Sequence, residues 1–368
     1  MMMKRMGAWM LLALLTLVGE WYGRCYGCLD EERIGLLEIQ SLVNPDGVSW
    51  RDHWVDSSNC CEWYGIECDN TTRRVIQLSL YGARDYSLGD WVLNASLFQP
   101  FKELQSLELG DNGLVGCLEN EGFEVISSKL RELGLSQNRF NNDKSILSCF
   151  NGNHSTLESL DLSNNWLTGG SFCDLSSRLK KLENLLLSGN QCNDSIFPSL
   201  TGFSSLKSLD LSYNWLTGSA SIISFQLQPM RLGKLENLDL SGNRLNNSIL
   251  SILSGLSTLK SLDLSFNELT AGLGGSFYGF KDLSSRFKKL ENLDMGWNQC
   301  NDSIFSTLTG FSSLKSLGLS RNQLTGSASI ISFEIISSHL WKLESLDLSY
   351  NQLTGSITSK LHSFYQEN

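Results

Sequence analysis

The stretch LENLDMGWNQCNDSI, residues 290–304, gathers side chains that could bind a metal ion or carry redox chemistry. Asp294, Met295 and Cys300 supply carboxylate and sulfur within seven positions, and Trp297 lies between them. Sulfur ligands beside carboxylates are typical of transition-metal sites. The alternative is that these residues belong to a scaffold and point in different directions. The elements that position them decide between the two.

A second pair with redox spacing, Cys25 and Cys28, forms a C-x-x-C motif near the N-terminus. Two basic residues and an eleven-residue apolar run precede it, which is typical of a secretory signal and too short to span a bilayer. Small residues predict cleavage after Gly27, with Gly23 as the less favoured position. Because the pair straddles this cleavage point, we expect no redox role. Secretion predicts an oxidising compartment in which disulfides persist.

The opening stretch is one of ten copies of the frame L-x-x-L-x-L-x-x-N, and VIQLSL at 75–80 is a degenerate first strand. The terminal asparagines recur every 24 to 31 residues, at Asn112, Asn138, Asn165, Asn190, Asn214, Asn243, Asn267, Asn298, Asn322 and Asn351. A period of about 20–29 residues with this frame indicates leucine-rich repeats. The sequence therefore predicts an α/β solenoid, a right-handed leucine-rich-repeat superhelix with a concave parallel β-sheet.

The frame fixes the direction of each side chain. In x-L-x-L-x the alternating leucines point into the core, and the residues between them face outward on the sheet. The asparagine carboxamide both donates and accepts, so it can pair backbone groups of neighbouring coils. On this frame Met295 and Cys300 point inward, like Cys192, whereas Asp294 and Trp297 point outward. The metal interpretation of the opening stretch therefore fails.

Composition and motifs argue against several classes of function. A net charge of −10 gives no basic surface for nucleic acid, which is therefore not expected as a partner. No G-x-S-x-G, H-E-x-x-H or P-loop motif occurs. The four histidines fall outside the predicted concave strands, at His53, His154, His339 and His362. With no base beside the many serines and aspartates, we expect no enzyme, no metal and no cofactor.

Residues 28–74 are predicted to form an N-terminal cap. Asp30 is expected to N-cap a helix. The apolar face of that helix carries Leu36, Ile39 and Val43. The aromatic residues expected to cover the open end of the leucine core are Trp50, Trp54 and Trp63. The domain prediction is thus a signal peptide at 1–27, the cap at 28–74 and repeats over 75–368, with no transmembrane or kinase segment.

Four cysteines of the cap, Cys28, Cys60, Cys61 and Cys68, allow three pairings, one of which requires a strained bond between adjacent residues. We favour Cys28–Cys60 with Cys61–Cys68, and the crossed pairing Cys28–Cys61 with Cys60–Cys68 is the alternative. Each bridge is expected to contribute about 2–4 kcal/mol.

Three further cysteines, Cys117, Cys149 and Cys173, lie in connecting segments of the first repeats. A bridge between neighbouring coils, such as Cys117–Cys149, would satisfy two of them. Their odd number leaves the third thiol without an assignment.

The cap pattern C…W…CCEWYGIEC…RVIQLSL resembles the plant-type N-terminal cap of leucine-rich-repeat proteins. The tail N-x-L-T-G-S-I at 351–357 resembles the plant-specific extracellular repeat, and CLENEGFE at 117–124 strengthens the likeness to plant receptor-like proteins. Such proteins usually continue through more repeats, a C-terminal cap, one membrane helix and a short tail. Because the chain ends at Asn368 without these parts, the expectation is a truncated member.

The resemblance implies a secreted or cell-surface recognition protein in defence or developmental signalling. It would bind a peptide, protein or glycan through its concave face and would signal through a co-receptor kinase. It would be extracellular, or at the plasma membrane if the full product continues into a membrane helix. The alternatives are a soluble inhibitor of a secreted enzyme, similar to polygalacturonase-inhibiting proteins, and a non-functional truncated paralogue.

An internal duplication points to the residues that would bind. Residues 174–225 and 282–333 match at 42 of 52 positions. Six of the ten differences fall on the twelve outward strand and turn positions, at 186/294, 188/296, 189/297, 210/318, 213/321 and 215/323. We therefore expect the concave face to have diversified for recognition, while uneven drift is the alternative. The predicted ligand-binding residues are Asp210, Tyr213, Trp215, Phe266, Asp294, Trp297, Arg321 and Tyr350.

Outward acidic positions form a row comprising Glu108, Asp161, Asp210, Asp239, Asp263, Asp294 and Asp347. Such a row could accept a basic peptide, but aspartate in L-D-L-S is better explained as part of the repeat, bonded to the neighbouring serine, and the aromatic residues are the favoured ligand contacts. Sequons predict N-glycosylation at Asn70, Asn94, Asn153, Asn193, Asn246 and Asn301. The last three follow a ladder asparagine by three residues, so we expect their glycans along one lateral edge, away from the concave face.

Overall fold

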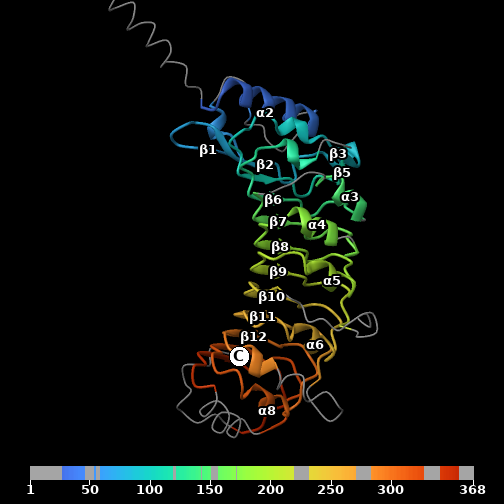
Figure 1. Ribbon diagram of the computed structural model, residues 1–368, viewed down its shortest axis with the longest axis vertical. Helices are drawn as coiled ribbons and strands as arrows, with labels where there is room; N and C mark the ends of the chain where they lie inside the picture. Colours follow the sequence, from blue (N-terminus) through green and yellow to red (C-terminus); the bar gives the residue numbers. More distant parts are fainter. Residues whose placement is uncertain are drawn as a thin grey trace, which may run out of the picture.

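The computed structural model describes residues 27–45, 54, 59–118, 122–141, 143–150, 156–170, 172–218, 232–270, 283–326 and 340–355. Within these ranges the chain forms an elongated solenoid, with strands along one side, short helices along the other and helix α2 at the N-terminal end (Figure 1). Each repeat contributes one coil, and neighbouring coils bury one another's leucines, as expected for a solenoid.

The principal sheet contains twelve described strands in the order β1-β2-β4-β6-β7-β8-β9-β10-β11-β12-β13-β14, parallel throughout except for the antiparallel β1–β2 pair. Their bounds are β1 Ile66–Cys68, β2 Val75–Ser79, β4 Ser106–Glu108, β6 Glu132–Gly134, β7 Ser159–Asp161, β8 Asn184–Leu186, β9 Ser208–Asp210, β10 Asn237–Asp239, β11 Ser261–Asp263, β12 Asn292–Asp294, β13 Ser316–Gly318 and β14 Ser345–Asp347. The central leucines pair in register, for example Leu209 with Leu238. The predicted solenoid fold and its concave sheet are confirmed.

Short elements occupy the other side of the coils. The helices are α2 Asp30–Val43, α3 Asp143–Leu147, α4 Phe172–Arg178, α5 Ile196–Leu200, α6 Ile249–Leu253 and α8 Ile304–Leu308, and the 3-10 turns are η1 Cys60–Glu62, η2 Tyr86–Leu88, η3 Ala95–Phe98 and η4 Phe123–Val125. A second sheet pairs β3 Trp91–Leu93 with β5 Leu114–Cys117. None of the helices in the described ranges is both long and apolar enough to cross a bilayer.

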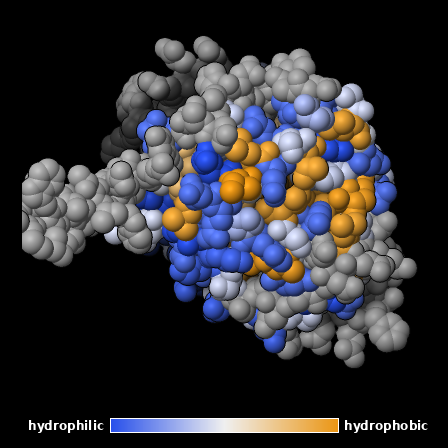
Figure 2. Space-filling view, turned by 90° about the horizontal axis from the view of Figure 1, so that it is seen from above, coloured by the Kyte–Doolittle hydropathy of each residue, from blue (hydrophilic) through white to orange (hydrophobic). Residues whose placement is uncertain are grey.

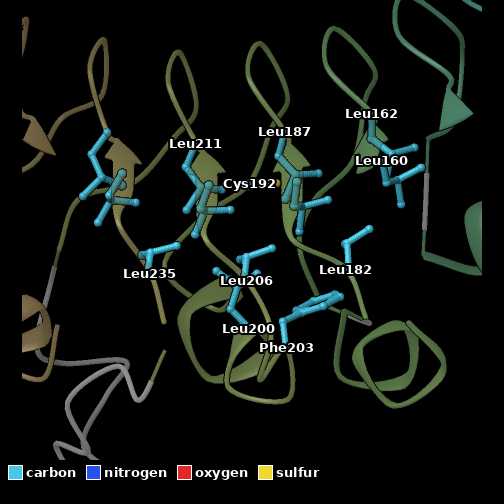
Figure 3. Close-up of a cluster of buried hydrophobic side chains, with 14 of the residues drawn as sticks. Leu160, Leu162, Leu182, Leu187, Cys192, Leu200, Phe203, Leu206, Leu211 and Leu235 are labelled. Atoms are coloured by element: carbon cyan, nitrogen blue, oxygen red, sulfur yellow. The ribbon is translucent and has the colours of Figure 1, made fainter. Parts of the chain in front are cut away.

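The core is a continuous stack of leucines between the strands and the short helices. Figure 3 shows Leu187 and Leu211 projecting inward from the strand side, with Leu206, Leu200 and Phe203 facing them from the other side of the coil. All five are buried. The thioether of Met295 and the thiols of Cys192 and Cys300 are also fully buried, so the predicted inward direction of these three residues is confirmed.

Helix α2 closes the N-terminal end of this core with Leu36, Ile39 and Val43, all buried as predicted. The prediction that Asp30 is the N-cap is wrong by one residue. Leu29 has the extended conformation of an N-cap and offers no side-chain hydrogen bond, while Asp30 begins the first helical turn. Three acidic residues in that turn interact favourably with the positive end of the helix dipole, which compensates for the missing cap.

A buried ion pair fixes α2 to the first strand. The Glu32 carboxylate is fully buried and accepts a 2.8 Å hydrogen bond from Arg74 Nε. It also accepts a 3.2 Å bond from the backbone N–H of Val75 at the start of β2. Removing Arg74 would leave the buried Glu32 carboxylate without its ion-pair partner.

The cap disulfides join Cys28 to Cys60 and Cys61 to Cys68, which confirms the favoured pairing over the crossed one. Cys117 and Cys149 form the bridge between neighbouring coils that their positions allowed. The side chain of Cys173, like Cys25, lies outside what the structure describes.

Two of the three predicted capping tryptophans have the expected role. Trp54 and Trp63 are buried and stacked, with ring centroids 5.4 Å apart. Trp50 lies outside the described residues. Figure 2 looks onto this end of the molecule and shows hydrophobic residues interspersed with hydrophilic ones on the surface around the cap.

The ladder asparagines join the coils as the frame predicts, and Asn214 illustrates the pattern. Its Nδ2 donates to the carbonyl oxygen of Leu187 in the preceding coil at 2.9 Å, and to those of Leu211 and Ser212 in its own coil. Its Oδ1 accepts from the backbone N–H of Cys192 at 2.9 Å. One buried side chain thus pairs four backbone groups that would otherwise be buried without a partner.

Candidate ligand-binding face

The concave face is organised in columns, because parallel pairing in register places equivalent positions of each repeat side by side. One column follows the central strand leucine. Its neighbouring members on β9 to β14 are Asp210, Asp239, Asp263, Asp294, Gly318 and Asp347. Four consecutive aspartates therefore lie next to one another, and the row is interrupted once, at Gly318.

Each of these aspartates has a local structural role. The carboxylates of Asp210, Asp263 and Asp294 accept hydrogen bonds of 2.8–2.9 Å from the backbone N–H two residues further on. The same bond occurs at Asp239 and Asp347. The interpretation of the row as part of the repeat is therefore confirmed, and the row alone does not identify a ligand.

The middle of the row carries an electrostatic cost. Partial burial, followed by the charges of neighbouring aspartates, raises the pKa of Asp239 and of Asp263 above the ordinary value of 3.8. For Asp263 the neighbours responsible are Asp294 and Asp210. At the other end of the sheet, burial likewise raises the pKa of Glu108. The face is thus acidic and would favour a positively charged group.

A second column lies one residue before each ladder asparagine, where the backbone turns. Its members all have positive φ and are Asp111, Gln137, Asn164, Gly189, Tyr213, Gly242, Phe266, Trp297, Arg321 and Tyr350. Residues with a Cβ adopt this left-handed conformation at a cost of roughly 1–2 kcal/mol. For a large side chain in this column, contacts with neighbouring side chains must therefore offset the cost of the backbone conformation.

Four consecutive members of this column form one continuous stack. The rings of Phe266 and Trp297 lie 4.5 Å apart with 19° between their planes. The Arg321 guanidinium then lies 4.1 Å from the centroid of the Trp297 ring and 3.9 Å from that of Tyr350. These contacts span coils seven to ten. We call Phe266, Trp297, Arg321 and Tyr350 the concave stack.

The concave stack remains accessible although its members contact one another. Phe266 is 43% exposed, Trp297 45% and Tyr350 68%. Aromatic and arginine side chains held rigid on a surface are typical anchors of binding interfaces, because little conformational entropy remains to be lost. The geometry provides a broad apolar surface with one cation in its centre.

Not all predicted ligand-binding residues join this stack. Tyr213 and Trp215 are well exposed but lie on earlier coils, and no ring contact links them to the concave stack among the described residues. The Tyr213 ring instead covers Gly242, where an added Cβ would lie 2.7 Å from the ring. Asp210 and Asp294 lie in the acidic row. The predicted ligand-binding residues therefore fall into three groups, which are the concave stack, the acidic row and two separate aromatic side chains.

At two glycines of the concave face, the missing Cβ leaves space that a side chain of the preceding coil occupies. A Cβ at Gly189 would meet Asn164 Oδ1 at 2.3 Å, so the Asn164 carboxamide occupies the space above that glycine. A Cβ at Gly318 would meet Asp294 Oδ1 at 2.5 Å, so the Asp294 carboxylate extends over the next coil. Sequence reasoning missed this role, although the glycines in the two columns signalled it.

Sequence reasoning also missed a set of hydrogen bonds between neighbouring coils, which we call the Asp clasp. The buried Asp194 accepts hydrogen bonds from Thr217 N and Oγ1 and from Gly218 N in the next coil, at 2.9, 2.6 and 3.0 Å. In the second copy Asp302 binds Thr325 and Gly326 in the same way. The recurring pairs N-D-S and L-T-G were the available sequence signal.

The predicted glycosylation sites Asn193, Asn246 and Asn301 lie in these same segments, just before α5, α6 and α8. Each Oδ1 accepts the backbone N–H two residues later. Asn193, Asn246 and Asn70 are exposed, and Asn94 and Asn301 are partly exposed. Asn153 lies outside the described residues. N-glycosylation at these positions, along the lateral edge, stays a prediction.

The side chains of residues 290–304 do not converge on a common site. Met295 and Cys300 are buried, whereas Asp294 and Trp297 lie on the concave surface. Across the described part of the chain, no group of three or more histidine, cysteine, aspartate or glutamate side chains is arranged to hold a metal ion.

Sequence families and solved structures match this architecture. Residues 29–69 match the leucine rich repeat N-terminal domain, and leucine rich repeat models match residues 156–177, 204–220, 234–256, 255–272 and 342–364. The chain is 33% identical over 220 residues to Cuscuta receptor 1 of Solanum lycopersicum, covering 48% of this chain and 19% of that protein. It is 31% identical over 274 residues to receptor like protein 21 of Arabidopsis thaliana, covering 72% of this chain and 22% of that protein.

The aligned part of the chain thus spans about a fifth of the length of these relatives. In fold the chain is similar to a plant ice-binding protein, with a TM-score of 0.54 and 24% identity over 90% of this chain and 97% of that one. That similarity concerns the fold alone. The chain is a leucine-rich-repeat protein with a leucine rich repeat N-terminal domain, and its sequence is similar to those of plant receptor-like proteins.

Proposed function

We propose that the chain is the ligand-recognition part of a receptor-like protein, acting outside the cell or at the cell surface. Its concave face would bind a peptide, a protein or a glycan, and a co-receptor kinase would carry the signal. The concave stack is the observation that carries this proposal. It presents ordered, exposed aromatic surface on coils seven to ten, where packing of the core does not require it.

The internal duplication supports a role in binding rather than in folding. The first copy has Gly189, Tyr213 and Trp215 where the second has Trp297, Arg321 and Gln323. The Asp clasp is the same in both copies, and the buried residues differ only by exchanges such as Leu187 for Met295. The scaffold therefore folds without the stack residues, so their presence in one copy calls for a separate explanation, which ligand binding provides.

The similarity to receptor-like proteins supports the same proposal from sequence. Cuscuta receptor 1 is named as a receptor, and the matching region includes repeats of the kind that form this concave face. Coverage of about a fifth of that protein leaves its activity and partners as proposals for this chain.

The test replaces three concave-face residues of the second copy with the corresponding residues of the first. The secreted chain would be screened against a random peptide library displayed on phage and against an array of plant cell-wall oligosaccharides. A variant carrying Trp297→Gly, Arg321→Tyr and Gln323→Trp, the residues of the first copy, would be screened in parallel. We expect the wild type to select ligands that the variant does not bind. Equal selection by both proteins would contradict a role of the concave stack.

A matched variant controls for sequence changes away from the concave face. Pro198→Ser with Ser199→Thr introduces the second copy's residues into α5, away from the concave face. This exchange should leave ligand selection unchanged, because it alters the short helix and not the sheet.

A further inference from the structure

The Arg321 guanidinium is held between two aromatic rings, yet its N–H donors remain available to a ligand. Both of its faces are covered, by Trp297 at 4.1 Å and by Tyr350 at 3.9 Å. A guanidinium has five N–H donors, all in its plane, and stacked rings cannot accept from them. Among the described residues, no carboxylate lies within ion-pair distance of this group. Its edge therefore presents charged donors to the concave side.

The charges around Arg321 restrict the classes of ligand that could bind beside it. The acidic row is interrupted at Gly318, in the same coil as Arg321. The Asp294 carboxylate extends over that glycine, and Asp347 lies on the next strand. The cationic Arg321 thus lies between coils that each carry a carboxylate, Asp294 on one side and Asp347 on the other. A polyanion would be repelled by the row, whereas a ligand with a carboxylate and a basic group fits both.

We propose that Arg321 is the specificity-determining residue of the concave face and binds a carboxylate of a peptide that also carries a basic side chain. This inference rests on the proposed function and names the ligand class for the same site. The planar fork of the guanidinium matches a carboxylate with two parallel hydrogen bonds. The stacking rings fix its plane in advance, so little side-chain entropy is lost on binding. The exposed Trp297 and Tyr350 rings would contact apolar groups beside the carboxylate.

A second copy of the site within the chain serves as the reference. Position 213 corresponds to 321 in the duplication and carries tyrosine with φ of 51°, the value also found at Arg321. Arg321→Tyr therefore introduces a residue that this backbone accommodates and removes the guanidinium, with both its charge and its planar fork. Arg321→Lys keeps the charge and removes the planar fork. Arg244→Gln changes the net charge equally at an exposed arginine outside the stack.

The experiment uses three synthetic heptapeptide libraries, each with one fixed lysine. The first ends in a free carboxylate and lacks aspartate and glutamate, the second is its C-terminal amide, and the third is an amide with one internal aspartate or glutamate. The immobilised full chain, the three variants and Trp297→Gly would be incubated with each library and, separately, with a tetramer of galacturonic acid. Retained ligands would be quantified by mass spectrometry.

We expect the wild type and Arg244→Gln to retain carboxylate-bearing peptides over the neutral amides by at least about tenfold, as the strength of charged hydrogen bonds implies. Arg321→Tyr should abolish this preference, and Arg321→Lys should retain only part of it. Preference for the first library would identify a C-terminal carboxylate, and preference for the third a side-chain carboxylate.

Two results would overturn the inference while leaving the proposed function intact. In the first, peptides are retained and lost on Trp297→Gly, but neither a carboxylate nor Arg321 affects them; the proposed function then stands and the role of Arg321 does not. In the second, a tetramer of galacturonic acid binds in an Arg321-dependent manner and no peptide library is enriched. Absence of any binding that depends on Trp297 or Arg321 would refute the proposed function together with the inference.

Discussion

The two copies of the duplicated block, residues 174–225 and 282–333, share a scaffold and differ in the surface that this scaffold presents. Their ladder asparagines, Asn214 and Asn322, each donate to three carbonyl oxygens and accept one backbone N–H. The exposed pair Lys207–Glu183 at one edge also has its counterpart in Lys315–Glu291. These contacts join coils, so any sequence that keeps them can stack.

The concave surfaces of the two copies differ in kind. In the first copy, Gly189 leaves space that the Asn164 carboxamide fills. In the second copy, Trp297 at the equivalent position links Phe266 to Arg321 in a continuous stack. The comparison shows that one backbone geometry accepts either surface. The difference therefore concerns what the face can bind rather than whether the coil forms.

The energies involved support this division. A tryptophan in the left-handed conformation costs roughly 1–2 kcal/mol. Ring stacking returns about 0.5–1.5 kcal/mol, and the arginine contact at an exposed site about 0.5–1 kcal/mol. The backbone cost and the contact terms nearly cancel, so stacking alone does not account for a large side chain at this position. A tryptophan that stays 45% exposed is better explained by binding.

The largest expected effect tests whether the scaffold is equivalent in the two copies. Asn214→Ala and Asn322→Ala each remove the side chain that pairs four backbone groups, and each should lower the free energy of unfolding by about 3 kcal/mol. Thermal unfolding followed by circular dichroism measures both. A difference of more than about 1.5 kcal/mol between them would contradict the shared scaffold, since that exceeds the usual context dependence of one buried bond.

A smaller effect is expected at the clasp. Asp194→Ala leaves the backbone N–H groups of Thr217 and Gly218 without their acceptor and should cost about 2 kcal/mol. Asp302→Ala should cost somewhat less, because Asp302 is more exposed and water can replace it. Hydrogen exchange at Thr217 and at Thr325 reports on each clasp directly. Unchanged exchange at Thr217 in Asp194→Ala would show that the clasp does not protect this turn.

The smallest effect is expected in the acidic row. The second copy contributes Asp294 to this row, whereas the first copy has Leu186 at the equivalent position. Asp294→Asn removes a like charge and should lower the raised pKa of Asp263, while burial keeps it above 3.8. Carboxyl-detected NMR titration measures this change. Asp347→Asn is the matched control and should leave Asp263 unaffected.

The sign of the stability change follows from the raised pKa. The folded chain binds a proton at Asp263 more readily than the unfolded chain, so the stability it contributes is fully present below pH 3.8. That contribution is lost as the pH rises through the folded-state pKa. Asp294→Asn should therefore flatten the pH dependence of unfolding just above pH 3.8. An unchanged profile would indicate that the neighbouring charge is screened by water.

Much of this architecture could be predicted from the sequence because the repeat imposes it. The frame predicted the sheet, the buried Cys300 and the outward Trp297, since a period of two fixes the face of each strand residue. The strain of a bond between adjacent cysteines excluded one of the three cap pairings, and the structure decided between the other two. These predictions depend on covalent geometry and periodicity, which are local in the sequence.

The rest required distances between coils. That Trp297 contacts Phe266 and Arg321, and that Tyr213 lies over Gly242 instead, depends on which side chains lean towards the next coil. The repeat frame predicts on which face of the sheet each residue lies, but not the direction in which its side chain leans along that face. The position of Asp30 was missed for a similar reason, because a one-residue shift of a helix start leaves its apolar face unchanged.

The central claim is that Trp297 serves recognition and not folding, and the single substitution Trp297→Gly tests it most directly. The affinity for the peptide or oligosaccharide selected by the wild type would be measured by calorimetry, with the unfolding midpoint recorded on the same samples. We predict at least about a tenfold loss of affinity, as for an interface anchor, with the free energy of unfolding changed by less than about 1 kcal/mol. Undiminished affinity, or a loss of affinity accompanied by unfolding, would contradict this claim.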